Sequence, residues 1–125
     1  MKFKKYFITN KDGYSNCVIR SFCKIYNKEY DEVYNDLCNI QKELNCESFN
    51  YIPVFETYMN RNNTEAINYG EDIKIKDLEL DNNSYIIFCC DKKDFYHMVT
   101  IINNTLYDRD DSSFDLYTIR IYKKQ

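Results

Sequence analysis

The sequence is poor in the residues that build linkers and phosphate-binding loops. Its 125 residues include two glycines, one proline, one histidine and no tryptophan. With so little glycine and proline we expect no flexible linker, and the length fits a single domain over residues 1–125. A glycine-rich phosphate loop needs several glycines close together, so Gly13 and Gly70 exclude nucleotide binding of that kind.

The chain also lacks a dominant charge and a long apolar run. Seventeen basic side chains face 20 acidic ones, for a net charge of -3. This balance argues against a protein that grips the phosphate backbone, so nucleic acid is not an expected partner. No stretch approaches about 18 uncharged apolar residues, and residues 1–10 hold no secretory apolar core. We therefore expect a cytoplasmic protein that makes no use of a membrane.

Six cysteines are present despite this cytoplasmic expectation, where thiols stay reduced. Structural zinc is typically held by paired cysteines two to four residues apart, and the chain has no such pair. Cys89 and Cys90 are adjacent and point to opposite faces of a predicted strand. We expect neither a metal nor a cofactor, and we interpret Cys23, Cys38, Cys89 and Cys90 as structural.

Helical periodicity in the first half and strand periodicity in the second predict an α+β domain. Residues 65–83 carry a mixed signal, with one helical turn at 76–80. We expect three helices packed on a C-terminal antiparallel sheet whose strands form a meander. The predicted helices cover residues 16–27, 29–44 and about 53–60, and the predicted strands cover 85–90, 97–102, 105–110 and 117–122.

Cys17 lies in the first turn of the first predicted helix, with Ser15 or Asn16 as the cap. Unpaired backbone amides and the positive end of the helix dipole stabilise an anion there. A thiolate at such a position, next to an imidazolium, is a nucleophile at neutral pH.

The one histidine, His97, opens a predicted strand that turns through Asn103-Asn104. Two asparagines suit a two-residue type I′ turn, which would pair Ile102 with Thr105 and His97 with Asp110. Strand alternation then predicts one face that carries His97, Val99, Ile101, Leu106, Asp108 and Asp110. We expect the first helix to cover the apolar part of this face, which brings Cys17 to His97. Asp108 is the favoured carboxylate partner of His97, with Asp110 and Asp111 as alternatives.

Residues 16–21, 31–34, 96–99 and 106–108 together resemble the small papain-like cysteine-peptidase-fold proteins of bacteria and their phages. The resemblance spans about residues 10–113 and implies a papain-like fold with a catalytic Cys17, His97 and Asp108. Larger papain relatives carry an oxyanion glutamine six positions before the cysteine, where this chain has Lys11. The backbone amide of Cys17 and the side chain of Asn10 are our candidate oxyanion donors, with Asn16 as a weaker one.

These features predict a thiol hydrolase that cleaves an amide, isopeptide or thioester bond in a peptide or protein substrate. A deamidase or acyl transferase would use the same triad. The alternative from another class is a phage or host interaction module that keeps the fold without catalysis. Arg20, one turn after Cys17, is expected in a surface ion pair, and the second reading is that it holds a neighbouring carboxylate or helps to stabilise the thiolate. The sequence leaves the oligomeric state open.

Overall fold

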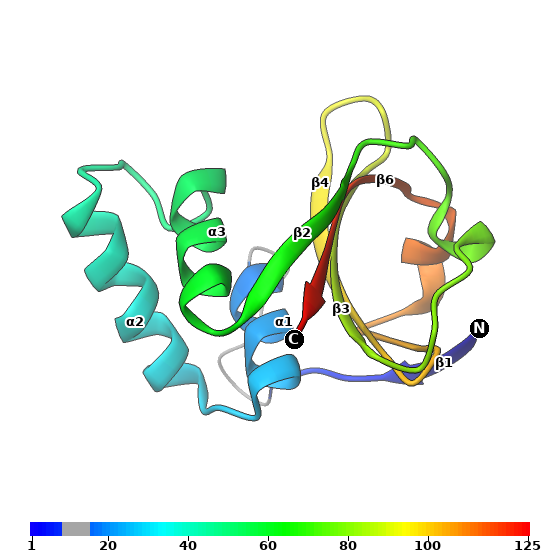
Figure 1. The fold of residues 1–125 in the computed structure, drawn as a ribbon, viewed down its shortest axis with the longest axis horizontal. Helices are drawn as coiled ribbons and strands as arrows, with labels where there is room; N and C mark the ends of the chain where they lie inside the picture. Colours follow the sequence, from blue (N-terminus) through cyan, green and yellow to red (C-terminus); the bar gives the residue numbers. More distant parts are fainter. Residues whose placement is uncertain (9–15) are drawn as a thin grey trace.

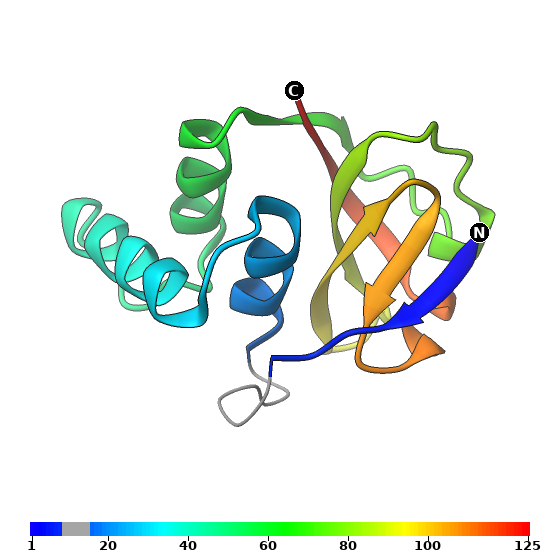
Figure 2. The same cartoon turned by 90° about the horizontal axis from the view of Figure 1, so that it is seen from below.

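The computed structural model describes residues 1–8 and 16–125. Helices gather on one side of a strongly curved sheet, and two 3-10 turns lie on its other side (Figures 1 and 2). The α+β class is thus confirmed. The helices are α1 (Cys17–Tyr26), α2 (Tyr30–Glu43) and α3 (Ile52–Arg61), and the 3-10 turns are η2 (Ile75–Asp77) and η3 (Asp111–Asp115).

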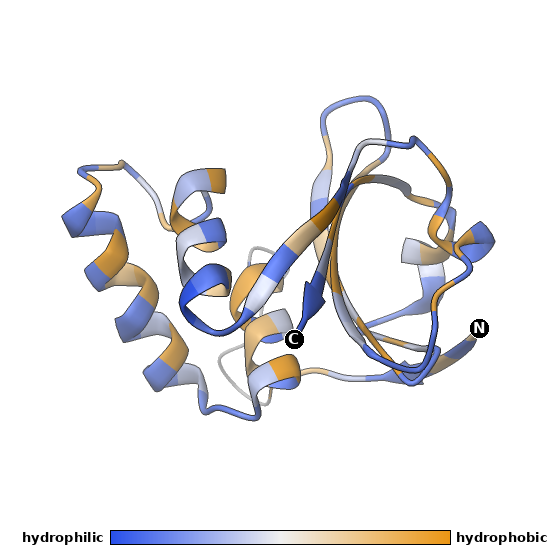
Figure 3. Ribbon diagram, in the orientation of Figure 1, coloured by the Kyte–Doolittle hydropathy of each residue, from blue (hydrophilic) through white to orange (hydrophobic). Residues whose placement is uncertain are grey.

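The ends of the helices carry residues that favour helix termination or initiation. Asn27 closes α1 in the left-handed region at φ 53°, and its N–H donates to the carbonyl of Cys23. Asp31 and Glu32 place negative charge in the first turn of α2, and Pro53 occupies the first turn of α3. Hydrophobic and hydrophilic stretches alternate along each helix, as expected of helices with one buried and one exposed face (Figure 3).

The sheet is mixed and has six strands in the order β1-β5-β4-β3-β6-β2. The expected antiparallel meander is therefore wrong beyond β3, β4 and β5, because β6 returns to pair with β3 on its other side. β1, which precedes the helices, pairs parallel with β5 and forms one edge. The strands are β1 (Lys2–Lys5), β2 (Thr64–Tyr69), β3 (Ser84–Cys90), β4 (Tyr96–Ile102), β5 (Thr105–Asp108) and β6 (Tyr117–Lys124).

The β4–β5 hairpin turns through Asn103 and Asn104, both at positive φ (51° and 56°). Ile102 pairs with Thr105 as predicted, and Ile101 with Leu106. The predicted pairing of His97 with Asp110 is wrong, because β5 ends at Asp108 and the chain turns away into η3.

Both faces of the sheet are covered by apolar residues. The helices pack on one face, against Ile86, Met98 and Tyr122. The opposite face holds a second cluster that contains Val99, Ile101 and Leu106, packed by residues of the η2 and η3 segments, among them Leu78, Leu80, Phe114 and Leu116. The expectation that the first helix covers Val99, Ile101 and Leu106 is therefore wrong. β4 is buried on both faces, so alternation alone does not choose the face that receives the helix.

Across residues 1–8 and 16–125, none of the helices combines the length and the apolar character that crossing a bilayer requires.

Candidate active site

Two hydrogen bonds fasten α1 to β4 one turn after Cys17. The Ser21 hydroxyl donates to the carbonyl of Met98 at 3.1 Å, and the Thr100 hydroxyl donates to the carbonyl of Ser21 at 3.1 Å. Both contacts are buried. Since Met98 follows His97 directly, this docking brings the start of α1 to the start of β4, and Cys17 and His97 border the same cleft.

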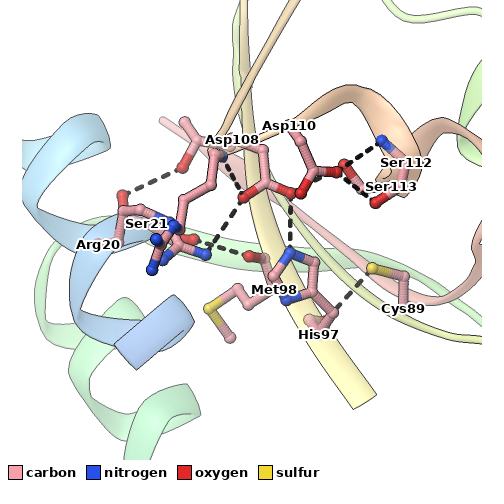
Figure 4. A network of polar contacts seen from close by, with 11 residues as sticks. Arg20, Ser21, Cys89, His97, Met98, Asp108, Asp110, Ser112 and Ser113 are labelled. Carbon is pink, nitrogen blue, oxygen red and sulfur yellow. Dashed lines mark hydrogen bonds and ion pairs between the residues drawn. The ribbon is translucent and has the colours of Figure 1, made fainter. Parts of the chain in front are cut away.

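The Asp108 carboxylate is the centre of a buried polar network (Figure 4). His97 Nε2 lies 2.8 Å from Asp108 Oδ2, and the Ser113 hydroxyl donates to the same oxygen at 2.9 Å. Oδ1 accepts from Arg20 Nη2 at 3.2 Å and from the backbone N–H of Arg109 at 2.8 Å. Only 4% of Asp108 is exposed. The carboxylate is thereby fixed in position and oriented toward the imidazole.

The other two acidic candidates lie away from the imidazole. Asp110 accepts from the backbone N–H of Ser112 at 2.9 Å and from the Ser112 hydroxyl, and so caps η3. Asp111 is exposed in the first turn of η3. Among the three carboxylates that the sequence offered, Asp108 is the one in contact with His97.

The charge state of His97 follows from its neighbours. Burial of the ring opposes protonation, but hydrogen bonds to Asp108 and Cys17 and the electrostatic interactions with them outweigh it and raise the pKa of His97 to about 9. Burial alone would raise the pKa of Asp108, but its hydrogen bonds, led by that of His97, hold this pKa below its usual value. At neutral pH the pair is imidazolium and carboxylate.

This shift predicts a loss of stability at alkaline pH. The folded state holds the His97 proton more tightly than the unfolded chain, whose histidine titrates near 6.5. The contribution is complete below pH 6.5 and disappears as pH rises through about 9. We expect a fall in the free energy of unfolding of about 3 kcal/mol over that window, measured by urea denaturation. His97→Gln should lack this fall, and equal pH slopes for both proteins would contradict the prediction.

Arg20 is not the surface residue that the sequence favoured. It is 3% exposed and its guanidinium forms the ion pair with Asp108, so the second reading, a grip on a neighbouring carboxylate, is the observed one. Both Cys17 and Arg20 belong to α1. The same helix therefore places Cys17 in the cleft that His97 borders and the Arg20 guanidinium against Asp108, the carboxylate that contacts His97. Ser113 has no counterpart in the sequence prediction, since nothing in the local pattern distinguishes it from an ordinary loop serine.

The cleft beside Cys17 has a volume of about 650 Å³. Its residues come from three places: the start of α1, the connection between α2 and α3 with the first turn of α3, and the ends of β3 and β4. Tyr51 and Tyr96 are among them and both are exposed, whereas the spacing of the tyrosines predicts that most of them are half-buried core residues. The lining residues are Cys17, Val18, Asn50, Tyr51, Ile52, Pro53, Phe55, Phe88, Tyr96, His97 and Met98.

Of the candidate oxyanion donors, Asn10 and the residue at the glutamine position, Lys11, lie outside the described residues. Asn16 is the N-cap residue of α1, and its side chain makes no capping hydrogen bond. The first amides of α1, including that of Cys17, lack intrahelical acceptors, as at every helix start.

The remaining cysteines are free thiols. Cys89 is buried beneath the site, where its thiol donates to the carbonyl of His97 at 3.4 Å, and burial raises its pKa well above the usual value. Cys23 is buried in the helical core. In the part of the chain with described structure, no three His, Cys, Asp or Glu residues are grouped so as to hold a metal ion.

Comparison of the chain with protein-family models, with curated proteins and with solved structures finds no match.

Proposed function

We propose that the protein is a cysteine hydrolase that cleaves an amide, isopeptide or thioester bond of a peptide or protein. The observation that carries the proposal is the position of His97, which contacts Asp108 through Nε2 and borders, with Cys17, one open cleft. Nucleophile, base and orienting carboxylate in this order are the parts that acyl transfer through a thiol requires.

In the proposed reaction, Cys17 Sγ attacks the substrate carbonyl as a thiolate paired with the His97 imidazolium. A carbon–sulfur bond forms, the bond to the leaving group breaks, and the leaving group takes the His97 proton. His97 then accepts a proton from water, whose oxygen attacks the thioester carbonyl. A carboxylic acid is released and the thiolate and imidazolium are restored. Nε2 is bonded to Asp108, so Nδ1 is the ring nitrogen that serves the sulfur.

Each supporting group has a defined part in this proposal. Asp108 holds the ring orientation and stabilises the imidazolium, and the helix-start amides stabilise the oxyanion. Asn10 stays a sequence-based candidate for a second donor. A deamidase or an acyl transferase would share the first half of the cycle and differ in the acceptor of the second.

Alkylation with iodoacetamide at pH 6 tests the proposal. Cys17 is expected to react at least about 10-fold faster than the other five thiols, because the proposal pairs it, at the start of α1, with the His97 imidazolium across the shared cleft. Peptide mapping by mass spectrometry assigns the rates. His97→Ala should remove the advantage of Cys17, whereas Cys46 serves as an internal reference in both proteins. Uniform slow labelling would instead favour an interaction module without catalysis.

A further inference from the structure

Most of the residues that line the cleft beside Cys17 are apolar. The start of α3 contributes Ile52, Pro53 and Phe55, and the sheet contributes Phe88 and Met98. Phe55 and Phe88 lie with ring centroids 5.4 Å apart. Phe88 in turn stacks on Tyr96 at 5.9 Å. The three rings are therefore in continuous contact, from the buried Phe55 to the exposed Tyr96.

The cleft has few ionisable lining residues. None of the described lining residues is an aspartate, glutamate, lysine or arginine, so apart from tyrosine hydroxyls the ionisable groups that line the cleft are Cys17 and His97. A charged side chain that entered would lose its hydration without gaining a partner, which costs several kcal/mol in general. An uncharged apolar group would instead cover Ile52, Pro53 and Phe88, which keep solvent-exposed surface in the cleft, and gain free energy.

The size and the mouth of the cleft fit part of a peptide. About 650 Å³ accommodates a bulky side chain together with the backbone on either side of it. Asn50 and the exposed Tyr51 and Tyr96 supply polar groups among the lining residues, where a peptide backbone needs hydrogen-bond partners. An apolar floor with a few polar groups is the usual composition of a specificity pocket.

We propose that this cleft binds a bulky, uncharged apolar side chain of the residue that supplies the scissile carbonyl. The inference rests on the proposed function, which it extends from a reaction to a substrate class. Two observations identify the occupant. Cys17 lines the cleft, so the bound side chain lies next to the reacting carbonyl, and the described lining residues include no acidic or basic residue besides His97 and Cys17, so the side chain is apolar.

Three chloromethyl ketones test the preference: those of N-acetyl-phenylalanine, N-acetyl-lysine and N-acetyl-aspartate. In each reaction the Cys17 sulfur forms a thioether with the methylene carbon and chloride leaves. Rates are divided by those with free cysteine to remove intrinsic reactivity. We expect the phenylalanine reagent to modify Cys17 at least about 10-fold faster than either charged reagent, as burial of one large apolar side chain allows. Equal normalised rates would overturn the proposal.

A pair of matched variants tests whether the preference for the phenylalanine reagent arises in the cleft. Ile52→Glu introduces a carboxylate among the lining residues, and Ile67→Glu makes the same change on β2, where Ile67 is 52% exposed. The ratio of the phenylalanine rate to the lysine rate should fall at least about 10-fold in Ile52→Glu and stay at the wild-type value in Ile67→Glu. Because it is a ratio within one protein, changes in thiol reactivity cancel.

A second pair guards against loss of folding. Tyr96 lines the cleft and is 61% exposed, whereas Tyr69 on β2 is 69% exposed and lies outside it. Tyr96→Glu should lower the same ratio and Tyr69→Glu should not, with thermal unfolding followed by circular dichroism for all four variants. An unchanged ratio in folded Ile52→Glu and Tyr96→Glu would overturn the proposal.

Binding of a neutral dye separates this inference from the proposed function. N-phenyl-1-naphthylamine fluoresces in apolar sites and needs no nucleophile. It should bind saturably to Cys17→Ala and at least about 10-fold more weakly to Cys17→Ala combined with Ile52→Glu. If iodoacetamide fails to single out Cys17 while the dye binds in this way, the hydrolase proposal falls and the apolar site stands. Absence of saturable binding overturns the site itself.

Discussion

Cys17→Ser is expected to lower turnover of the thiophenyl ester of N-acetyl-phenylalanine at least about 1,000-fold, because a serine hydroxyl beside the same histidine is a far weaker nucleophile. Thiophenol release, followed by absorbance, measures the rate. The midpoint of thermal unfolding should change little, since Cys17 is only half-buried and begins a helix that Ser21 fastens to the sheet.

The control for this loss is Cys38→Ser, which makes the same change at another half-buried cysteine, on α2. Cys38 lines no part of the cleft beside Cys17, so its replacement should leave turnover within about two-fold of wild type. Retention of turnover by Cys17→Ser would end the assignment of Cys17 as the nucleophile. Equal losses in both variants would attribute the effect to altered stability.

Arg20→Met is expected to reduce the free energy of unfolding by about 1.5–3 kcal/mol, the usual contribution of a hydrogen bond to a charged group, because the His97 imidazolium still compensates the Asp108 carboxylate. Both members of the pair are almost fully buried, at 3% exposure for Arg20 and 4% for Asp108. Two donors contact Oδ1 of Asp108 in the described residues, the Arg20 guanidinium and the backbone N–H of Arg109. Removal of the guanidinium leaves the second of them. Urea denaturation at pH 7 measures the change.

Arg61→Met is the matched control, because Arg61 forms a shorter ion pair, 2.8 Å to Glu43, with both side chains about half exposed. Surface pairs of this kind contribute 0–1 kcal/mol, so its removal should cost no more than about 1 kcal/mol. Similar losses for Arg20→Met and Arg61→Met would show that burial does not set the strength of the Arg20–Asp108 contact.

Local sequence signals predicted the elements well where one residue type settles the geometry. The paired asparagines 103 and 104 fixed the hairpin and its register next to the turn, and Pro53 marked the first turn of α3. The apolar spacing placed α1 and α2 to within one residue at each end. These are short-range effects, which a single sequence contains in full.

Long-range arrangement was less predictable for physical reasons. β1 has the sequence Lys-Phe-Lys-Lys and is exposed throughout, so no apolar pattern marked it as a strand. Its place is set by backbone pairing with β5, and lysine is common on such edges. β4 is buried on both faces, which concealed which face the helices would cover.

The candidate site shows the same division. His97 and Asp108 follow from strand alternation near the turn, and the structure brings them together at 2.8 Å. Their catalytic roles, like that of Cys17, stay predictions. Arg20 reaches Asp108 from α1 over 88 positions, a contact that depends on the complete topology. Ser113 lies only five positions from Asp108, but no local pattern marked the turn at η3 that brings its hydroxyl back to the carboxylate.

The fastening of α1 to β4 also bears on how the chain folds. Ser21 meets Met98 and Thr100 across 77 and 79 positions, so forming these bonds closes a long loop at a cost in chain entropy. Contacts with such high sequence separation slow folding. We therefore expect that Cys17 and His97 come to border one cleft only when this loop closes, and that partly folded chains hold an ordinary cysteine.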